Sequence, residues 1–528
     1  MRCINNPNYV ILILFLMTFI PKVILGQWSQ IGSSINGEAA GDESGFSVSL
    51  SSNGNRLAVG AYLNDANGTN SGSVRVYKNN SGNWVQVGLD INGENANDRS
   101  GHSVSLSADG TRIAIGANFN SENGYAAGHV RVYEEIGGSW IQIGGDIDGE
   151  AGGDQSGYSV SLSEDGKRVA IGAPANEGNG SGSGQCRVYK EVAGVWIKIG
   201  ADLDGEAIAD ESGYAVSLSG DGKKVAIGAH FNDGNGHDVG HVRVYKENMG
   251  SWVKVGNDID GEGPEDYFGN SVSLSFDGTR LAIGGPHNDG SYPNAGHARI
   301  YEEIFGNWMQ IGTDIDGEGA EDESGNFVSL SSDGNHLVIG AIKNDGNGID
   351  AGHVRVYKYY SGSWIQVNND IDGENIDDWS GNSVSISADG SRIAVGARFN
   401  DNNGSNSGNV RVFGCINIYN ATDMIYYCSL EDALAASATD DGDEIQIPTG
   451  NYSLPCITVN KSITLTPVGG SVTIGCLTVN GSGKILELGG NIQISTLTLI
   501  NGKISTNGYN LKCGAISGGN SLSYIVTD

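Results

Sequence analysis

Tryptophan recurs seven times along this chain at a fixed interval of 56 residues. A single hydrophobic core does not require one residue type at so strict a spacing, whereas an array of one copied unit does. We therefore expect seven copies of a 56-residue unit. The tryptophans are Trp28, Trp84, Trp140, Trp196, Trp252, Trp308 and Trp364.

Each unit contains four short runs rich in Val, Ile, Ser and Tyr, which clusters of Gly, Asp and Asn separate. In the fourth copy these runs are residues 196–200, 215–219, 224–229 and 241–245. The pattern is typical of strands joined by turns. Because a four-stranded sheet buries both faces only between two copies of itself, the repeats predict an all-β fold, a seven-bladed β-propeller over residues 27–413.

The first and last copies are incomplete in complementary ways. Residues 28–31 form a Trp strand with no unit before it, while the last copy, residues 381–413, has no Trp strand after it. If the N-terminal strand pairs with the last blade, the ring closes and leaves no unpaired sheet edge.

The repeats resemble FG-GAP repeats, the propeller units of integrin α-subunits and of many bacterial surface proteins. The resemblance rests on the Gly that opens each inner strand, on Gly-Ala-Pro and Gly-Gly-Pro at 172–174 and 284–286, and on the closing Val-Arg-Val-Tyr strand. It implies a calcium-binding, Asp-rich loop between the first and second strands. Here that loop is of the type Ala-Asp-Gly at 108–110, so the usual calcium cage of the family is missing.

Composition and the N-terminus indicate an exported protein. Arg2 and Lys22 flank an apolar run at 9–20, and Gly26 precedes the first repeat, so residues 1–26 are predicted to be a signal peptide. An uncleaved anchor is the alternative, although the run is short for a membrane span. The net charge of −32 argues against a nucleic acid partner. We expect a secreted or cell-surface monomer with no transmembrane segment in the mature chain.

Residues 414–528 form a different module. A helix is expected at 429–438, and strand-like segments at 457–459, 477–479 and 496–499 recur about every 20 residues. The segment resembles the opening of a right-handed parallel β-helix of the pectin-lyase type, complete or as a fragment. Its cysteines predict one or two disulfides, with Cys415 to Cys428 favoured over Cys456 to Cys476.

An acidic pattern, Asp-x-Asp-Gly-Glu-x-x-x-Asp, precedes the inner strands. Alternating carboxylates can supply oxygens to calcium, the one metal predicted here, but the same acids can equally cap turns and pair with cations. Both alternatives stay open. The five complete sets are Asp146, Asp148, Glu150, Asp154; Asp202, Asp204, Glu206, Asp210; Asp258, Asp260, Glu262, Asp266; Asp314, Asp316, Glu318, Asp322; and Asp370, Asp372, Glu374, Asp378.

Each copy also carries one Arg in the middle of a strand, which we expect to pair with the repeated Glu or Asp. In a meandering blade, the acidic loop and the Asn-Asp-Gly-Asn-Gly loop leave on the same side of the ring. One face should therefore be strongly acidic and carry the binding loops. The arginines are Arg75, Arg131, Arg187, Arg243, Arg299, Arg355 and Arg411.

No catalytic residue and no organic cofactor site is predicted, because the off-pattern residues form no recognisable catalytic set. The sequence favours a non-enzymatic binding or adhesion scaffold that recognises an extracellular protein or a polysaccharide through propeller-face loops. The alternative is a carbohydrate-active enzyme, a polysaccharide lyase or hydrolase, with the propeller as an accessory domain. The off-pattern residues are His237, Tyr267, Phe268, Tyr292, His336, Tyr359, Tyr360 and Trp379.

Overall fold

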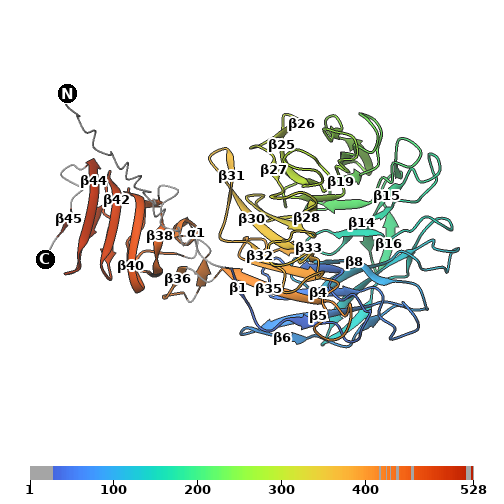
Figure 1. Ribbon diagram of the computed structural model, residues 1–528, viewed down its shortest axis with the longest axis horizontal. Coiled ribbons are helices and arrows are strands. Elements are labelled where there is room, and N and C mark those ends of the chain that lie inside the picture. Colours follow the sequence, from blue (N-terminus) through green and yellow to red (C-terminus); the bar gives the residue numbers. More distant parts are fainter. Residues whose placement is uncertain are drawn as a thin grey trace, which may run out of the picture. The chain divides into compact units, whose positions relative to one another are not determined.

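The computed structural model describes residues 28–415, 418–423, 425–427, 430–435, 439–452, 457–518 and 525–526. The chain divides into two compact units, one built on the repeats and one on the C-terminal segment (Figure 1). The predicted signal peptide lies outside the described residues. Within the described ranges, no helix has the length and apolar character needed to cross a membrane.

The seven repeats together form seven antiparallel sheets, which confirms the seven-bladed propeller. In each sheet four strands meander outward, and a two-residue strand extends the pairing of the third. In the first blade the four are β3 (Ser47–Leu50), β4 (Arg56–Ala61), β5 (Ser73–Asn80) and β6 (Asn83–Gln86), with β7 (Ile91–Asn92) paired to β5.

Five further blades repeat this arrangement. Their strands are β8 (Ser100–Leu106), β9 (Arg112–Ala117), β10 (His129–Ile136), β11 (Ser139–Gln142), β12 (Ile147–Asp148); β13 (Ser159–Leu162), β14 (Arg168–Ala173), β15 (Gln185–Val192), β16 (Val195–Lys198), β17 (Leu203–Asp204); β18 (Ala215–Leu218), β19 (Lys224–Ala229), β20 (His241–Asn248), β21 (Ser251–Lys254), β22 (Ile259–Asp260); β23 (Ser271–Leu274), β24 (Arg280–Gly285), β25 (His297–Ile304), β26 (Asn307–Gln310), β27 (Ile315–Asp316); and β28 (Ser324–Leu330), β29 (His336–Ala341), β30 (His353–Tyr360), β31 (Ser363–Gln366), β32 (Ile371–Asp372).

The N-terminal strand completes the seventh blade, as predicted. β1 (Trp28–Gln30) pairs antiparallel with β35 (Asn409–Cys415), next to β34 (Arg392–Ala397) and β33 (Ser380–Ile386). β2 (Ile35–Asn36) pairs with the start of β35. Both ends of the repeat array therefore share one sheet, and the ring has no free edge at its seam.

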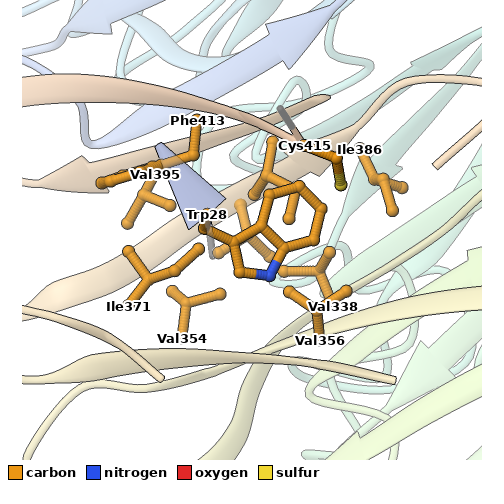
Figure 2. Close-up of a cluster of buried hydrophobic side chains, with 11 residues drawn as sticks. Trp28, Val338, Val354, Val356, Ile371, Ile386, Val395, Phe413 and Cys415 are labelled. Atoms are coloured by element: carbon orange, nitrogen blue, oxygen red, sulfur yellow. The ribbon is translucent and has the colours of Figure 1, made fainter. Parts of the chain in front are cut away.

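The repeated tryptophan joins each blade to the one before it. In six of the seven copies its indole N–H donates to a backbone carbonyl of the preceding blade, as from Trp84 to Ile31 at 2.9 Å. Figure 2 shows Trp28 among side chains of the sixth and seventh blades, including Val354 and Phe413. Similar clusters fill all seven blade interfaces. The 56-residue spacing thus follows from one contact made once per interface.

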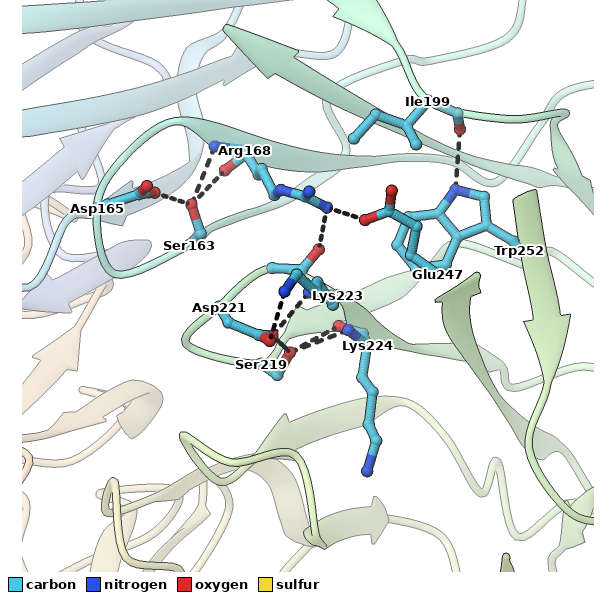
Figure 3. A network of polar contacts seen from close by, with 11 residues as sticks. Ser163, Asp165, Arg168, Ile199, Ser219, Asp221, Lys223, Lys224, Glu247 and Trp252 are labelled. Atoms are coloured by element: carbon cyan, nitrogen blue, oxygen red, sulfur yellow. Dashed lines mark hydrogen bonds and ion pairs between the residues drawn. The ribbon is translucent and has the colours of Figure 1, made fainter. Parts of the chain in front are cut away.

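Ion pairs also cross the blade interfaces (Figure 3). Arg168 on β14 contacts Glu247 on β20 of the next blade at 2.5 Å and donates to the carbonyl of Gly222 at 3.2 Å. The two charged side chains are only 12% and 17% exposed. Arg56 on β4 and Glu135 on β10 form the corresponding pair between the first and second blades.

The inner strands form a closed circle around the propeller axis. Ser49 Oγ accepts the N–H of Leu106 at 2.9 Å, and the same bond recurs until Ser385 accepts the N–H of Leu50 at 3.0 Å. At the ends of these strands, one leucine or isoleucine from each blade lines a cavity of about 190 Å³. The loops that precede the inner strands lie at the opposite end.

The C-terminal unit is a β-solenoid. From β38 onward, the strand pairs whose register is described are parallel, with partners such as Ile457 and Leu477 separated by 20 residues. The predicted period is confirmed, although residues 463–479 form one continuous strand. The elements after β35 are β36 (Ile418–Asn420), β37 (Ile425–Tyr427), α1 (Leu430–Ala435), β38 (Glu444–Tyr452), β39 (Ile457–Val459), β40 (Ile463–Val479), β41 (Ile485–Leu488), β42 (Ile492–Leu499), β43 (Lys503–Ser505), β44 (Leu511–Gly518) and β45 (Ile525–Val526).

The C-terminal segment contains disulfides, as predicted. Cys415 and Cys476 are each disulfide-bonded. Cys428 and Cys456 lie outside the described residues, so the connectivity stays a prediction. In the propeller, Cys186 is free and fully buried, and burial raises the pKa of its thiol to about 12. It is therefore a packing residue rather than a reactive thiol.

Candidate ligand-binding face

The acidic loops and the Asn-rich loops meet on one face, called the loop face below. Asn67, between β4 and β5, donates its side-chain amide to the carbonyls of Gly93 and Glu94 at 2.8 and 2.9 Å. Gly93 and Glu94 belong to the acidic loop that leads into the next inner strand. The prediction that both loop families share one side of the ring is confirmed.

The last Asp of each acidic set is a buried turn cap. In the fourth repeat, Asp210 accepts the backbone N–H of Ala207 at 2.8 Å and the side-chain amide of Asn232 at 3.0 Å. It is 1% exposed. This arrangement gives a structural role to one predicted metal ligand in each complete set, namely Asp154, Asp210, Asp266, Asp322 and Asp378.

The repeated Glu pairs with the repeated Arg in six of the seven repeats. Arg187 lies 3.6 Å from Glu150 and also donates to the carbonyl of Asp148 at 2.9 Å. Because the Arg is on the third strand of one blade and the Glu follows the two-residue strand of the previous blade, each pair bridges two blades. The predicted pairing of a buried charge is confirmed.

The first two carboxylates of each set are more exposed. The first accepts a hydrogen bond from the side chain four residues earlier, as Asp146 does from Gln142 at 2.6 Å. Burial, and then repulsion from this first carboxylate, raise the pKa of the second, as at Asp148, Asp260 and Asp372. A bound cation would relieve that repulsion, which favours calcium binding. Calcium at these sets stays a prediction.

Seven-fold symmetry breaks at the start of the inner strands, where one side chain from each blade forms a circle that we call the start ring. Four consecutive members are aromatic or imidazole rings, and the other three are asparagines. The centres of the Phe46 and His102 rings are 4.9 Å apart, and those of Tyr158 and Tyr214 are also 4.9 Å apart. The members are Phe46, His102, Tyr158, Tyr214, Asn270, Asn326 and Asn382.

A second circle, the rim ring, lies three residues before each start-ring member. All seven of its residues have a left-handed backbone with φ from 50° to 57°. Glycine would adopt this φ without steric cost, yet no copy has glycine here. The strained turn therefore holds seven side chains of five residue types around the loop face. They are Glu43, Arg99, Gln155, Glu211, Tyr267, Glu323 and Trp379.

Arg398 joins the two rings on one side of the axis. Its guanidinium lies 5.4 Å from the ring centre of Phe46, 4.8 Å from that of Trp379 and 4.5 Å from that of Phe399. Trp379 also packs edge-on against Phe399 with ring centres 4.8 Å apart. The group therefore presents a cation among aromatic faces.

Titratable groups at this site are shifted mainly by burial. Burial lowers the pKa of His102 to about 4 and that of His230 to about 3, so both imidazoles are neutral at pH 7. Burial also raises the pKa of Glu43 and, with help from that carboxylate, raises the pKa of Tyr62 to about 12. Tyr62 donates its hydroxyl to Glu43 at 3.1 Å.

The off-pattern residues disperse in the structure. Tyr267 and Trp379 lie on the rim ring, Phe268 is fully buried, and Tyr292 is exposed in an outer loop. The remaining four are His237, His336, Tyr359 and Tyr360, of which His237 is exposed, His336 is buried, and Tyr359 packs against Trp364. Sequence reasoning missed the start ring, whose signal is a variable position that directly follows Ser-Gly in six blades and Phe-Gly at 268–269 in the other.

In the described part of the solenoid, two lysines have partners on other coils. Lys484 pairs with Asp441, and Lys461 donates to the carbonyl of Thr439 at 2.5 Å. These contacts hold neighbouring coils together.

Comparison with known families agrees with this architecture. The FG-GAP repeat profile matches residues 36–77 and 372–413. Two repeats of the propeller therefore match the FG-GAP family, and the other five share their period and blade arrangement. Each match begins at the short strand of the acidic loop and ends with the third strand of a blade, so the outer Trp strand lies outside the matched unit.

The FG-GAP propeller also has similar solved structures. One is a chain of hydrazine synthase from Kuenenia stuttgartiensis, with 13% sequence identity, a TM-score of 0.46, and coverage of 72% of this chain and 97% of that chain. No curated protein sequence matches this chain.

Proposed function

We propose that this protein is a secreted or surface-displayed, non-enzymatic binding scaffold that recognises a glycan on the loop face of its FG-GAP propeller. One observation carries the proposal. The residues that build the blades repeat almost unchanged, whereas the start ring and the rim ring, which surround the axis on the loop face, differ from blade to blade.

The chemistry of the two rings suits a sugar. Four of the seven start-ring members offer aromatic or imidazole faces, on which the apolar C–H faces of a pyranose can pack. The three asparagines offer amide donors and acceptors for hydroxyl groups, and Glu43, Glu211 and Arg398 add charged hydrogen-bonding groups nearby. Because the chain has a net charge of −32, a neutral glycan is favoured over an acidic one.

An extracellular protein is the second candidate partner. Apolar side chains at several loop tips on the same face are largely exposed, which is typical of protein-binding surfaces. These residues are Tyr125 at 81%, Ile208 at 69%, Ile349 at 64% and Ile376 at 59% exposure.

A glycan array with the full mature chain tests the proposal. We expect binding to neutral glycans that falls at least about tenfold when Tyr158→Asn or Tyr214→Asn removes one aromatic face. Both changes copy the asparagine of sister blades, so folding should survive. Met249→Ser, at an exposed hairpin tip, is the matched control. Equal binding by all variants, or no glycan bound, would overturn the glycan proposal.

The enzyme alternative predicts a different result in the same assay. A lyase or hydrolase would release shorter, chemically altered products from the bound polysaccharide, and chromatography of the supernatant would detect them. A binding scaffold returns the ligand unchanged.

A further inference from the structure

One buried position on the loop face side of the third strand is polar in every blade. It is 0% to 3% exposed in all seven copies. Its neighbours are the repeated Glu of the acidic loop that precedes the blade and an Asp of the acidic loop that follows it. The occupants are Ser73, His129, Gln185, His241, His297, His353 and Asn409.

Amide side chains at this position donate directly into the carboxylates. Gln185 Nε2 lies 3.1 Å from Asp204 Oδ1, and Asn409 Nδ2 donates to Glu374 Oε2 at 3.1 Å. Two short polar contacts thus satisfy the acids in those blades. A histidine here is a different case, because its ring stands further from the carboxylates.

His129 has no such bond. It is fully buried, and both of its ring nitrogens lack a hydrogen-bond partner among the described residues. Its Nδ1 lies 3.8 Å from Asp146 Oδ2. The buried Glu94 Oε2 also has no partner in the described part of the chain. One ligand atom each from Glu94, His129 and Asp146 lie within 4.8 Å of one another.

We propose that Glu94, His129 and Asp146 form a binding site for a divalent transition metal ion of the zinc type, at the interface between the first and second blades. Tetrahedral zinc with bonds of about 2.1 Å places its ligand atoms roughly 3.4 Å apart. Rotamer adjustments of a few tenths of an ångström to about one ångström bring the three atoms to that spacing. One imidazole and two carboxylates suit zinc better than calcium, which prefers oxygen ligands only.

Neighbouring charges select this set among the similar ones. In the His241 set, the ammonium of Lys254 lies 2.7 Å from Asp258 and already supplies a cation. In the His297 set, Arg299 contacts both Glu262 and Asp314. In the His129 set, Arg131 contacts Glu94 alone at 3.3 Å, and the neutral Gln142 contacts Asp146.

The His353 set resembles the His129 set. Arg355 lies 3.7 Å from Glu318, and the neutral Gln366 contacts Asp370 at 2.6 Å. Glu318 is 49% exposed, compared with 34% for Glu94, so water competes more strongly there. We expect a second, weaker ion at this set.

The chain itself supplies the test variants. His129→Gln copies the third repeat, and Gln142→Lys copies the lysine that sister repeats place against the equivalent Asp. Both should fold, which thermal unfolding checks. Zinc titrations by calorimetry on the metal-free, full mature chain should show one ion fewer in His129→Gln. Gln142→Lys should weaken binding of that ion by about 10- to 100-fold.

Two further measurements sharpen the result. Lys254→Gln should add one zinc ion by freeing Asp258. Bound Co²⁺ should give the visible absorption of a nitrogen- and oxygen-ligated ion, and in His129→Gln only the weaker contribution of the His353 set should remain. The proposal is overturned if the folded wild type binds no zinc, if His129→Gln binds as much zinc as wild type, or if excess calcium displaces the ion.

Discussion

The indole N–H of Trp28 donates to the backbone carbonyl of Val367 at 3.3 Å, although 339 residues separate the two. The same bond joins neighbouring blades at five of the six other interfaces. The exception is Trp308, whose indole nitrogen has no partner among the described residues. At the seam the bond joins the two ends of the repeat array. Ring closure therefore uses the same chemistry as the other interfaces.

Deleting residues 27–33 should destabilise the propeller and promote self-association. The deletion removes β1, so half of β35 becomes an unpaired edge, and it removes the buried Trp28 side chain. We expect a loss of at least about 3 kcal/mol, the scale of truncating one buried tryptophan. Unfolding in urea and light scattering measure the two effects.

Trp84→Ala is the control, because it removes a similar indole contact without exposing an edge. It should destabilise the chain but leave it monomeric. A deletion variant that is monomeric and as stable as wild type would show that β1 does not close the ring.

The pair of Arg168 and Glu247 should be costly to break and cheap to replace. Glu247→Gln leaves a largely buried guanidinium without its counter-charge, and we expect a loss of about 1–3 kcal/mol in urea unfolding. The double variant Arg168→Met, Glu247→Leu should recover most of that loss. A double variant less stable than the single one would contradict this account of the interface.

The period of the sequence predicted the fold because each interface needs the same residues. Trp84 and Arg75 have fixed partners across blade interfaces and Asp42 has one within its own blade, so their spacing revealed the architecture and the closure. The start ring was not predictable in this way. Tyr158 and its six counterparts vary, and a variable position becomes informative only when the ring brings all seven copies together.

The Glu94, His129 and Asp146 cluster was hidden for a related reason. Asp146 was predicted as a metal ligand. Its two partners are far from it in sequence, since Glu94 follows β7 and His129 begins β10. Only the packing of adjacent blades brings the imidazole beside the two acids. The two-residue strands, such as β7, were equally invisible because they are too short to show periodicity.

Acid should destabilise the propeller through His230. Its folded-state pKa of about 3 is below the unfolded value of 6.5, so the unfolded chain binds the proton more readily. The stability linked to this group is complete above pH 6.5 and is lost as the pH falls from 6.5 toward 3. By pH 5 the loss should be about 2 kcal/mol, since each pH unit below 6.5 costs about 1.4 kcal/mol.

His230→Asn isolates this effect. Asn118 occupies the same position in another blade and is 1% exposed, so asparagine fits there. The urea midpoint of the variant should fall less between pH 7 and pH 5 than that of wild type. Identical pH dependence in the two proteins would remove His230 from the explanation.

Calcium should stabilise the propeller through the acidic sets, at several blades and weakly. At Asp148, Asp260 and Asp372, burial and then repulsion from the first carboxylate of the set raise the pKa of the second. An ion that binds only the folded chain raises stability by mass action, whereas sodium at equal ionic strength only screens the repulsion. Thermal unfolding with millimolar calcium should therefore give a higher midpoint than with matched sodium chloride.

The double variant Asp204→Asn, Asp260→Asn should reduce this difference between the two midpoints. Asp210→Asn should lower stability in both salts because Asp210 caps a turn. Matching curves for wild type in the two salts would show that these acids act only as turn caps and ion-pair partners.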